Sequence, residues 1–160
     1  MPTSAAGSKA LALKASGFTL LELLVVIALI AVASAGVSLS LRDSASSALQ
    51  RDAQRLAALL ETGRAKARAN GLPVVWRAHT QGSVHGFVFE GLPPPGLPKN
   101  WLNDSTRAAP GAALTLGPEP LIGPQAVALS NAQAPGQTLW VVTDGLRPFK
   151  VQSTSDGVTP

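Results

Sequence analysis

The sequence predicts an α+β fold in which one long N-terminal helix packs on a small antiparallel β-sheet. Three observations predict this fold. Residues 23–41 carry no charge, and an apolar stripe with helical spacing continues the pattern to residue 67. Beyond Asn70-Gly71-Leu72-Pro73, which is a strong helix stop, apolar residues fall in short runs broken by glycine and proline. Residues 71–160 are enough for one small domain with one core.

The first 41 residues divide into a leader and an apolar helix. Residues 1–17 are small, polar and weakly basic, and Lys9 and Lys14 keep this end in the cytoplasm by the positive-inside bias. Residues 18–41 are long enough to cross about 30 Å of hydrocarbon as a helix. We therefore expect a transmembrane helix at 18–41, with small residues on faces suited to close helix packing. These small residues are Ala28, Ala31, Ala33, Ser34, Ala35 and Gly36.

Residues 42–70 predict an amphipathic continuation of the same helix, so that one helix runs from about residue 18 to about residue 69. Charged side chains are expected on the faces away from the apolar stripe, in two pairs with stabilising i,i+3 spacing. The stripe consists of Leu49, Ala53, Leu56, Leu60, Gly63 and Ala67. The charged residues are Arg51, Asp52, Arg55, Glu61, Arg64 and Arg68, with Asp52–Arg55 and Glu61–Arg64 as the pairs.

Residues 71–160 predict a β-rich domain with many loops. Two apolar runs around Gln81-Gly82-Ser83 predict a hairpin, and Asp144-Gly145 predicts a turn between the last two strands. Trp101 and Leu102 are expected to anchor the proline-rich loop 92–98 to the core. The expected strands are 74–78, 84–90, 113–116, 121–122, 127–129, 139–143 and 148–152. The aromatic residues expected in the core or as loop anchors are Trp76, Trp101, Trp140, Phe87, Phe89 and Phe149.

Glu22 stands out because it lies at the start of the apolar helix. A carboxylate on a membrane-spanning segment is expensive and usually marks a function or a partner. An ordinary secretory signal peptide, cut after Ala31-Val32-Ala33 or Ala33-Ser34-Ala35, is one alternative, and a simple signal anchor is another. Signal peptides avoid charge in their apolar core, and a helix that continues in phase past the cut is needless for a discarded peptide. Both observations favour retention of the apolar segment.

The string Gly17-Phe18-Thr19-Leu20-Leu21-Glu22, followed by the apolar stretch, resembles the class III signal of type IV pilins and type II secretion pseudopilins. The resemblance implies that a prepilin peptidase cuts between Gly17 and Phe18 and methylates the new N-terminal Phe18. It also implies that the apolar segment is retained. In an assembled filament Glu22 would then pair with the Phe18 amine of a neighbouring subunit, which offsets the cost of two charges in hydrocarbon.

The remainder of the chain resembles the minor pseudopilin H (GspH) family and FimT-like minor pilins. The resemblance is carried by residues 49–76, from the helix into the first strand, and by residues 139–151, the closing strand, the Asp144-Gly145 turn and the last strand. It implies a bacterial inner-membrane protein with a single span, a cytoplasmic N-terminus and a periplasmic domain. Its partners would be other pseudopilins, both minor tip subunits and the major one, and the inner-membrane secretion platform. The subunit would be extracted into the periplasmic pseudopilus that drives export of folded proteins.

The composition argues against several other functions. The chain has no cysteine, which disfavours a disulfide-closed major pilin and excludes thiolate chemistry. After Glu119 only Asp144 and Asp156 are acidic, too few for a calcium cage. His79 and His85 lie near the expected hairpin and could face each other, but they lack further zinc ligands. We expect no enzyme activity, no cofactor and no metal; the serine of Gly82-Ser83-Val84-His85-Gly86 is misplaced for a nucleophile elbow.

DNA binding is the alternative function that the sequence leaves open. The net charge is +4, but the leader holds Lys9 and Lys14, so the rest of the chain is nearly balanced. The basic residues of the C-terminal region are scattered, and DNA is therefore not expected as a partner. A FimT-like minor pilin that acts in pilus assembly or DNA uptake remains the alternative to secretion. The basic residues concerned are Lys99, Arg107, Arg147 and Lys150.

Overall fold

The computed structural model describes residues 18–81 and 84–154, except for the side chains of 35–42, 81 and 84. The expected leader and the hairpin residues Gly82 and Ser83 lie outside the described residues. The chain divides into two compact units, Met1–Val37 and Ser38–Pro160. Helix α1 (Leu20–Asn70) contributes to both, and the predicted single long helix is therefore confirmed.

In the first unit, α1 exposes its apolar side chains. Among the described residues, no helix has both the length and the apolar character that crossing a membrane requires. The expected span 18–41 includes residues 35–41, whose side chains lie outside the description, so that span stays a prediction. The large exposed apolar residues here are Phe18, Leu20, Leu21, Leu23, Leu24, Val25, Val26, Ile27, Leu29, Ile30 and Val32.

In the second unit, α1 buries the predicted apolar stripe. Leu49, Leu56 and Leu60 are almost fully enclosed, and the smaller members of the stripe are buried as well. Gly63 lets Phe89 and its sheet approach closely, since a Cβ at this position would lie 3.2 Å from the Phe89 ring. Every buried apolar residue of the described chain belongs to this unit, which therefore has a core of its own.

The helix ends where the sequence predicts. Gly71 follows the last helical residue with φ of 63°, a left-handed conformation that favours glycine. The N–H of Leu72 donates to Ala67 O at 3.1 Å, and that of Gly71 donates to Arg68 O at 3.4 Å. These bonds satisfy carbonyls that a helix end otherwise leaves without partners. The Asn70-Gly71-Leu72-Pro73 stop is thus confirmed.

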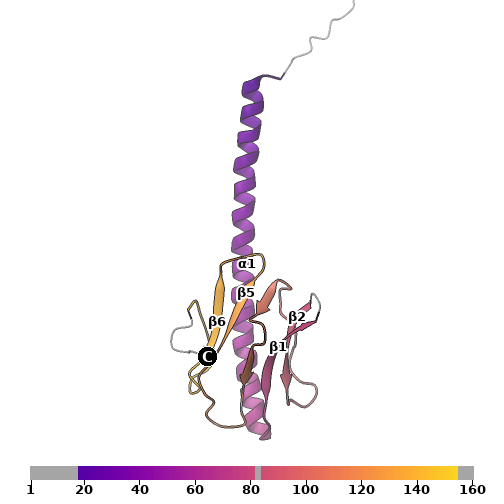
Figure 1. Ribbon diagram of the computed structural model, residues 1–160, viewed down its shortest axis with the longest axis vertical. Coiled ribbons are helices and arrows are strands. Elements are labelled where there is room, and N and C mark those ends of the chain that lie inside the picture. The colour runs from indigo at the N-terminus through magenta and orange to yellow at the C-terminus, as the bar shows by residue number, and fades with distance from the viewer. Residues whose placement is uncertain (1–17, 82–83, 155–160) are drawn as a thin grey trace, which may run out of the picture. The chain divides into compact units, whose positions relative to one another are not determined.

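Two antiparallel sheets pack with α1, where the sequence predicted one (Figure 1). The first has the order β2-β1-β4 and the second the order β3-β5-β6-β7. The stretch between β4 and β5 is rich in glycine and proline, which break a continuous ladder and let the chain start a second sheet. The strands are β1 (Val75–Gln81), β2 (Val84–Glu90), β3 (Thr106–Ala108), β4 (Ala113–Thr115), β5 (Gln125–Asn131), β6 (Thr138–Thr143) and β7 (Lys150–Gln152).

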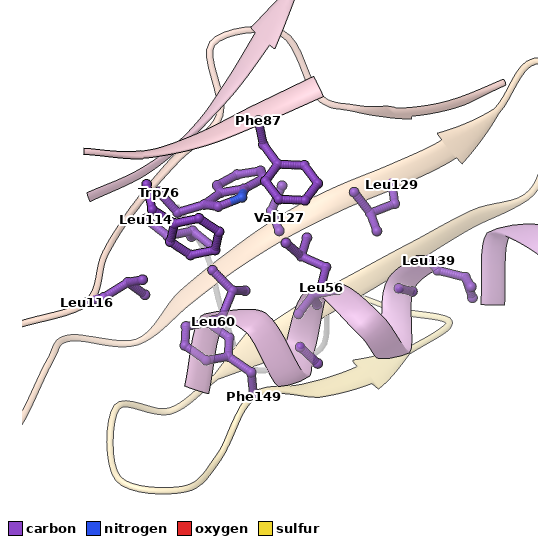
Figure 2. Close-up of a cluster of buried hydrophobic side chains, with 14 of the residues drawn as sticks. Leu56, Leu60, Trp76, Phe87, Leu114, Leu116, Val127, Leu129, Leu139 and Phe149 are labelled. Carbon is purple, nitrogen blue, oxygen red and sulfur yellow. The ribbon is translucent and has the colours of Figure 1, made fainter. Parts of the chain in front are cut away.

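Trp76 lies at the centre of the core. It is fully buried on β1, paired with Phe89 on β2 and with Leu114 on β4. Figure 2 shows Leu56 and Leu60 of α1 among the side chains of both sheets. The core therefore forms where the helix stripe and the inner faces of the two sheets meet.

Several local predictions need correction. Residues 121–122 form no strand, because this segment is tied to the helix and to a turn: Arg68 donates to Pro120 O at 2.6 Å, and Gly145 packs against Ile122 O. The last strand begins at residue 150 rather than 148. Strand β3 was not predicted, since it has three residues and forms through its pairing with β5.

The aromatic anchors are mostly confirmed. Trp101 is buried, and its ring meets Phe87 edge-on at a centroid distance of 4.7 Å, which ties the loop after residue 98 to the core. Its neighbour Leu102 is 62% exposed, so the prediction that it anchors this loop is wrong. Trp140 is half-buried. The other predicted aromatic residues, Trp76, Phe87, Phe89 and Phe149, are buried.

Candidate processing and assembly site

The first helical turn is built around Thr19. Phe18 and Thr19 precede α1, which begins at Leu20. The Thr19 hydroxyl accepts the N–H of Glu22 at 3.1 Å, and the Thr19 carbonyl accepts the N–H of Leu23 at 3.1 Å. A residue that starts the helical bonding with its carbonyl and caps it with its side chain is an N-cap. Thr19 and Glu22 also have the spacing of a capping box, so the sequence itself carries a signal for this helix start.

Glu22 occupies the first turn of α1 with an exposed side chain. A carboxylate in this position interacts favourably with the positive end of the helix dipole. The ion pairs of the described residues join Arg64 to Glu61, Arg77 to Glu90 and Arg147 to Asp144, and none of them uses Glu22. The helix dipole therefore stabilises part of this charge, and the ion pair with a neighbouring subunit stays a prediction.

Phe18 and Glu22 lie at the end of an apolar surface. Phe18 is 76% exposed, and the residues that follow Glu22 on α1 are exposed aliphatic side chains. Gly17, the other half of the predicted cleavage site, lies outside the described residues. A carboxylate among apolar side chains is stabilised most by a nearby cation when a neighbouring molecule covers the surrounding apolar surface and excludes water. Such an arrangement can join subunits.

The second unit contains a buried carboxylate, Asp52, although the predicted position of this residue is a solvent face of the helix. Asp52 is 1% exposed. Its Oδ1 accepts the N–H of Leu102 at 2.7 Å, and its Oδ2 accepts the N–H of Asn103 at 3.2 Å and the hydroxyl of Thr106 at 2.8 Å. The expected Asp52–Arg55 pair is replaced, since Arg55 donates to Asn100 O at 2.6 Å. Helix α1 thereby holds the loop before β3 through hydrogen bonds.

Arg64 is the second buried charge, at 3% exposed, and its predicted solvent face is also wrong. Its guanidinium donates to Gly145 O and, at 3.4 Å, to Arg147 O. The predicted pair with Glu61 is present at 3.8 Å, and Glu61 accepts the N–H of Phe149 at 2.9 Å. These contacts fasten the turn between β6 and β7 to the helix.

Side-chain hydrogen bonds and a close backbone contact fix the conformation of the Asp144-Gly145 turn. Asp144 Oδ1 accepts the N–H groups of Arg147 at 2.7 Å and Leu146 at 2.9 Å. These two hydrogen bonds hold the pKa of Asp144 below its ordinary value, and the bond from the Arg147 amide has the larger effect. Gly145 has φ of 87°, and a Cβ there would lie 1.8 Å from Ile122 O, so only glycine fits. The predicted turn is confirmed, together with the reason for its Asp-Gly sequence.

The two histidines do not form a pair. His79 lies opposite Gly86 in the hairpin, and His85 lies opposite Thr80, whose hydroxyl is 3.3 Å from His85 Nδ1. Successive residues of a strand point to opposite faces, so His79 and His85 lie on different faces of the sheet. The expectation that they could face each other is wrong.

The basic residues of the DNA alternative lie on separate elements. Lys99 precedes Trp101 in a loop, Arg107 is on β3, Arg147 is in the turn and Lys150 is on β7. All four are exposed. The structure brings no two of them onto one strand, and Arg147 already contacts Asp144 at 3.7 Å.

Residues 13–38 match the model of one protein family, described as the prokaryotic N-terminal methylation motif. The match covers Gly17, Phe18, Thr19 and Glu22. The motif supports a type IV pilin-like protein. It implies a membrane-anchored subunit with a periplasmic domain that is processed by prepilin peptidase and assembled with other pilins. Comparison with curated proteins and with solved structures finds no match. The α+β architecture of the chain agrees with such a subunit.

Proposed function

We propose that this chain is a minor pseudopilin of the type II secretion system, a structural subunit at or near the tip of the periplasmic pseudopilus. It acts by assembly and not as an enzyme. Growth of that filament from the inner-membrane platform drives folded proteins across the outer membrane. The observation that carries the proposal is the methylation motif at residues 13–38, with Glu22 in the first turn of an exposed apolar helix.

The chemistry of assembly follows from this arrangement. Cleavage after Gly17 leaves Phe18 with a positively charged amine at the start of an apolar segment. The positive end of the helix dipole makes that amine unfavourable within its own subunit. A Glu22 carboxylate from a neighbour supplies the opposite charge, and the apolar side chains around both exclude water. The charge pair sets the register between subunits, while helix packing along the apolar segment provides the adhesion.

The globular unit supports the choice of a GspH-like subunit. The resemblance includes the Asp144-Gly145 turn, and here that turn is held to the helix by Arg64 and to its own backbone by Asp144. A turn fixed from both sides presents Leu146 and Arg147 on a rigid surface, since both side chains are exposed. Such a surface suits a subunit that contacts neighbours in a filament.

The mature N-terminus tests the family. Mass spectrometry of the protein extracted from bacterial membranes is expected to find a chain that begins with N-methylated Phe18. A chain that begins at residue 34 or 36 would instead support the secretory signal peptide, and an unprocessed chain would support the simple signal anchor. A Gly17→Ala variant is expected to stay unprocessed and to run as the heavier precursor.

The role of Glu22 tests assembly. Glu22→Ala is expected to abolish incorporation into filaments and secretion, although processing still produces Phe18 at the N-terminus. Asp43→Ala is the matched control, because Asp43 is another exposed carboxylate on α1 that lies beyond the apolar run. Chemical crosslinking to other pilin-like subunits measures assembly. Normal filaments and secretion with Glu22→Ala would rule out the pairing.

The alternative is a FimT-like minor pilin of a type IV pilus that acts in pilus assembly or DNA uptake. The four exposed basic residues Lys99, Arg107, Arg147 and Lys150 are the observation in its favour. The globular unit from residue 42 onward is titrated with double-stranded DNA at low and moderate salt. Micromolar binding that weakens with salt would favour DNA uptake. Association with other minor pseudopilin domains, without DNA binding, would favour secretion.

A further inference from the structure

We propose that a hollow beside the proline-rich loop 92–98 is a docking site for a partner protein. The partner that fits it presents one large apolar side chain with a carboxylate next to it. The proposal goes beyond the proposed function, because it concerns a surface of the globular unit and not the apolar helix that joins subunits.

The hollow is formed by the end of β2 and the loop that follows it, and its volume is about 160 Å³. Phe89 belongs to the core, and Leu92 and Leu97 pack against the core from the loop. These three side chains give the hollow an apolar lining. The rest of the lining consists of Pro94, Pro95, Gly96 and Lys99.

The volume decides which kind of group can enter. Pockets for cofactors and drug-sized ligands usually measure about 300–1,000 Å³. An apolar cavity of about 150 Å³ accepts a molecule of the size of benzene. The hollow therefore fits one aromatic ring or one branched aliphatic side chain. A single side chain held in a pocket is a common anchor of protein–protein interfaces.

The loop that shapes the hollow is fixed at both ends. At its start, Gly91 has φ of 90°, and a Cβ there would clash with Pro73 O. At its end, Lys99 O accepts the N–H of Phe87 on β2 at 2.8 Å. A partner therefore meets a hollow that is already formed, and binding does not have to order the loop.

The charge beside the hollow is positive. Lys99 is exposed, and none of the ion pairs among the described residues uses it. Pro94 and Pro95 have no N–H to donate, and no residue of the lining is acidic. Arg55 donates to Asn100 O at 2.6 Å, so a second cation lies beside the residue that follows Lys99. A carboxylate on the partner complements this charge.

The carboxylates of the neighbouring elements do not compete for Lys99. Glu90 follows Phe89 on β2, so its side chain points to the opposite face of the sheet, where it pairs with Arg77 at 3.3 Å. Asp52 is buried and accepts three hydrogen bonds from other residues. The ammonium of Lys99 is thus available to a partner.

The surface around the hollow favours a protein over a small acid. Leu102, three residues after Lys99, is 62% exposed. A small molecule in the hollow would leave this apolar surface in water, whereas a partner protein covers it. The exposed apolar residues of the loop itself are Pro93, Pro94, Pro95 and Pro98.

The test titrates the full-length chain in detergent micelles with acetyl-phenylalanyl-glutamate amide and follows the backbone amide signals by NMR. Shifts are expected at residues 96, 97 and 99, with millimolar affinity. A probe with alanine in place of phenylalanine is expected to bind about tenfold more weakly. A probe with glutamine in place of glutamate is expected to bind about threefold more weakly.

Lys99→Gln tests the charge. This variant is expected to bind the glutamate probe about threefold more weakly and the glutamine probe like the unchanged chain. Lys150→Gln is the matched control, because Lys150 is another exposed lysine, and it is expected to bind both probes normally. Leu97→Ala removes part of the apolar lining and is expected to weaken both probes equally.

Each contrary result would overturn the proposal. Equal binding of the phenylalanine and alanine probes would mean that the hollow takes no large side chain. Equal losses with Lys99→Gln and Lys150→Gln would mean unspecific attraction between charges. Shifts confined to residues 18–34 would place the peptide in the micelle. Tighter binding of phenylpropionate than of the peptide would assign the hollow to a small acid, and shifts on concentrating the chain alone would assign it to a second copy.

Discussion

The Asp52 carboxylate accepts the backbone N–H of Leu102 at 2.7 Å, although 50 residues separate them in the chain. The same carboxylate also accepts bonds from Asn103 and Thr106. Further along α1, Arg64 donates to two carbonyls of the turn between β6 and β7. Buried polar side chains of the helix thus satisfy backbone groups of two distant loops, and those bonds decide where the loops lie.

Asp52→Asn is expected to destabilise the globular unit by about 2–4 kcal/mol. The amide that replaces one carboxylate oxygen turns a donor toward backbone N–H groups, and a buried donor without an acceptor is costly. Urea unfolding of residues 38–160 measures the change. Asp43→Asn, at an exposed position of the same helix, is the control and is expected to change the unfolding free energy by less than about 0.5 kcal/mol. Equal stability of the two variants would show that the Asp52 bonds contribute nothing.

Arg64→Lys is expected to destabilise the unit by about 2 kcal/mol, because an ammonium cannot bond two carbonyls with the fixed fork of a guanidinium. The carbonyls of Gly145 and Arg147 then lose their shared guanidinium donor, although the bond from Phe149 to Glu61 remains. Amide hydrogen exchange of residues 145–149 is expected to speed up locally. Arg51→Lys, on an exposed position of α1, is the control that keeps both measurements unchanged. Loss of stability without faster exchange at this turn would contradict the explanation.

Periodicity predicted the helix and its buried stripe because these depend on spacing along one segment. Leu49, Leu56 and Leu60 follow a rule that any amphipathic helix obeys. The burial of Asp52 and Arg64 depends instead on backbone groups far along the chain, so spacing alone placed them in solvent. One signal was present: Asp52 and Arg64 each lie three residues from one stripe residue and four from another, which places them beside the apolar face.

In the sheets, too, the elements that depend on local sequence were predicted and those that depend on distant pairing were not. The hairpin of β1 and β2 was predicted because its two runs are long and close in sequence. Strand β3 has only three residues and exists through pairing with β5, so no local pattern reveals it. At the site, Phe18 and Glu22 were predicted from a motif that is continuous in sequence. The Thr19 cap is equally local and was readable from the Thr-x-x-Glu spacing.

Gly145→Ala is expected to destabilise the unit by about 2–4 kcal/mol. The residue has φ of 87°, and an added Cβ would lie 1.8 Å from Ile122 O, so the backbone of one loop must move. Gly111→Ala is the matched control, because Gly111 has φ of 72° and its Cβ would meet nothing within 4 Å. That control isolates the conformational cost, about 1–2 kcal/mol. If both variants lost the same stability, the close approach to Ile122 would have no energetic effect.

Asp144 is expected to make the globular unit sensitive to acid. Hydrogen bonds from the Arg147 and Leu146 amides lower the pKa of the folded carboxyl below its ordinary value, so the folded state favours the ionised form. The stability this adds is present above the unfolded pKa, about 3.9, and is lost as the pH falls through the lower folded pKa. Urea unfolding between pH 7 and pH 2 is therefore expected to show a smaller loss for Asp144→Asn than for the unchanged chain.

The backbone hydrogen bonds and the charge of Arg147 contribute unequally to the low pKa of Asp144. The two backbone hydrogen bonds lower the pKa of Asp144 more than the charge of Arg147 does. Arg147→Gln keeps both amides and removes only the charge, so carboxyl NMR is expected to find most of the shift retained. Substitution of Gly145 by alanine displaces the turn and is expected to return the pKa toward its ordinary value. If Arg147→Gln alone removed the shift, the ion pair and not the turn would control the carboxyl, and salt would then weaken the acid sensitivity.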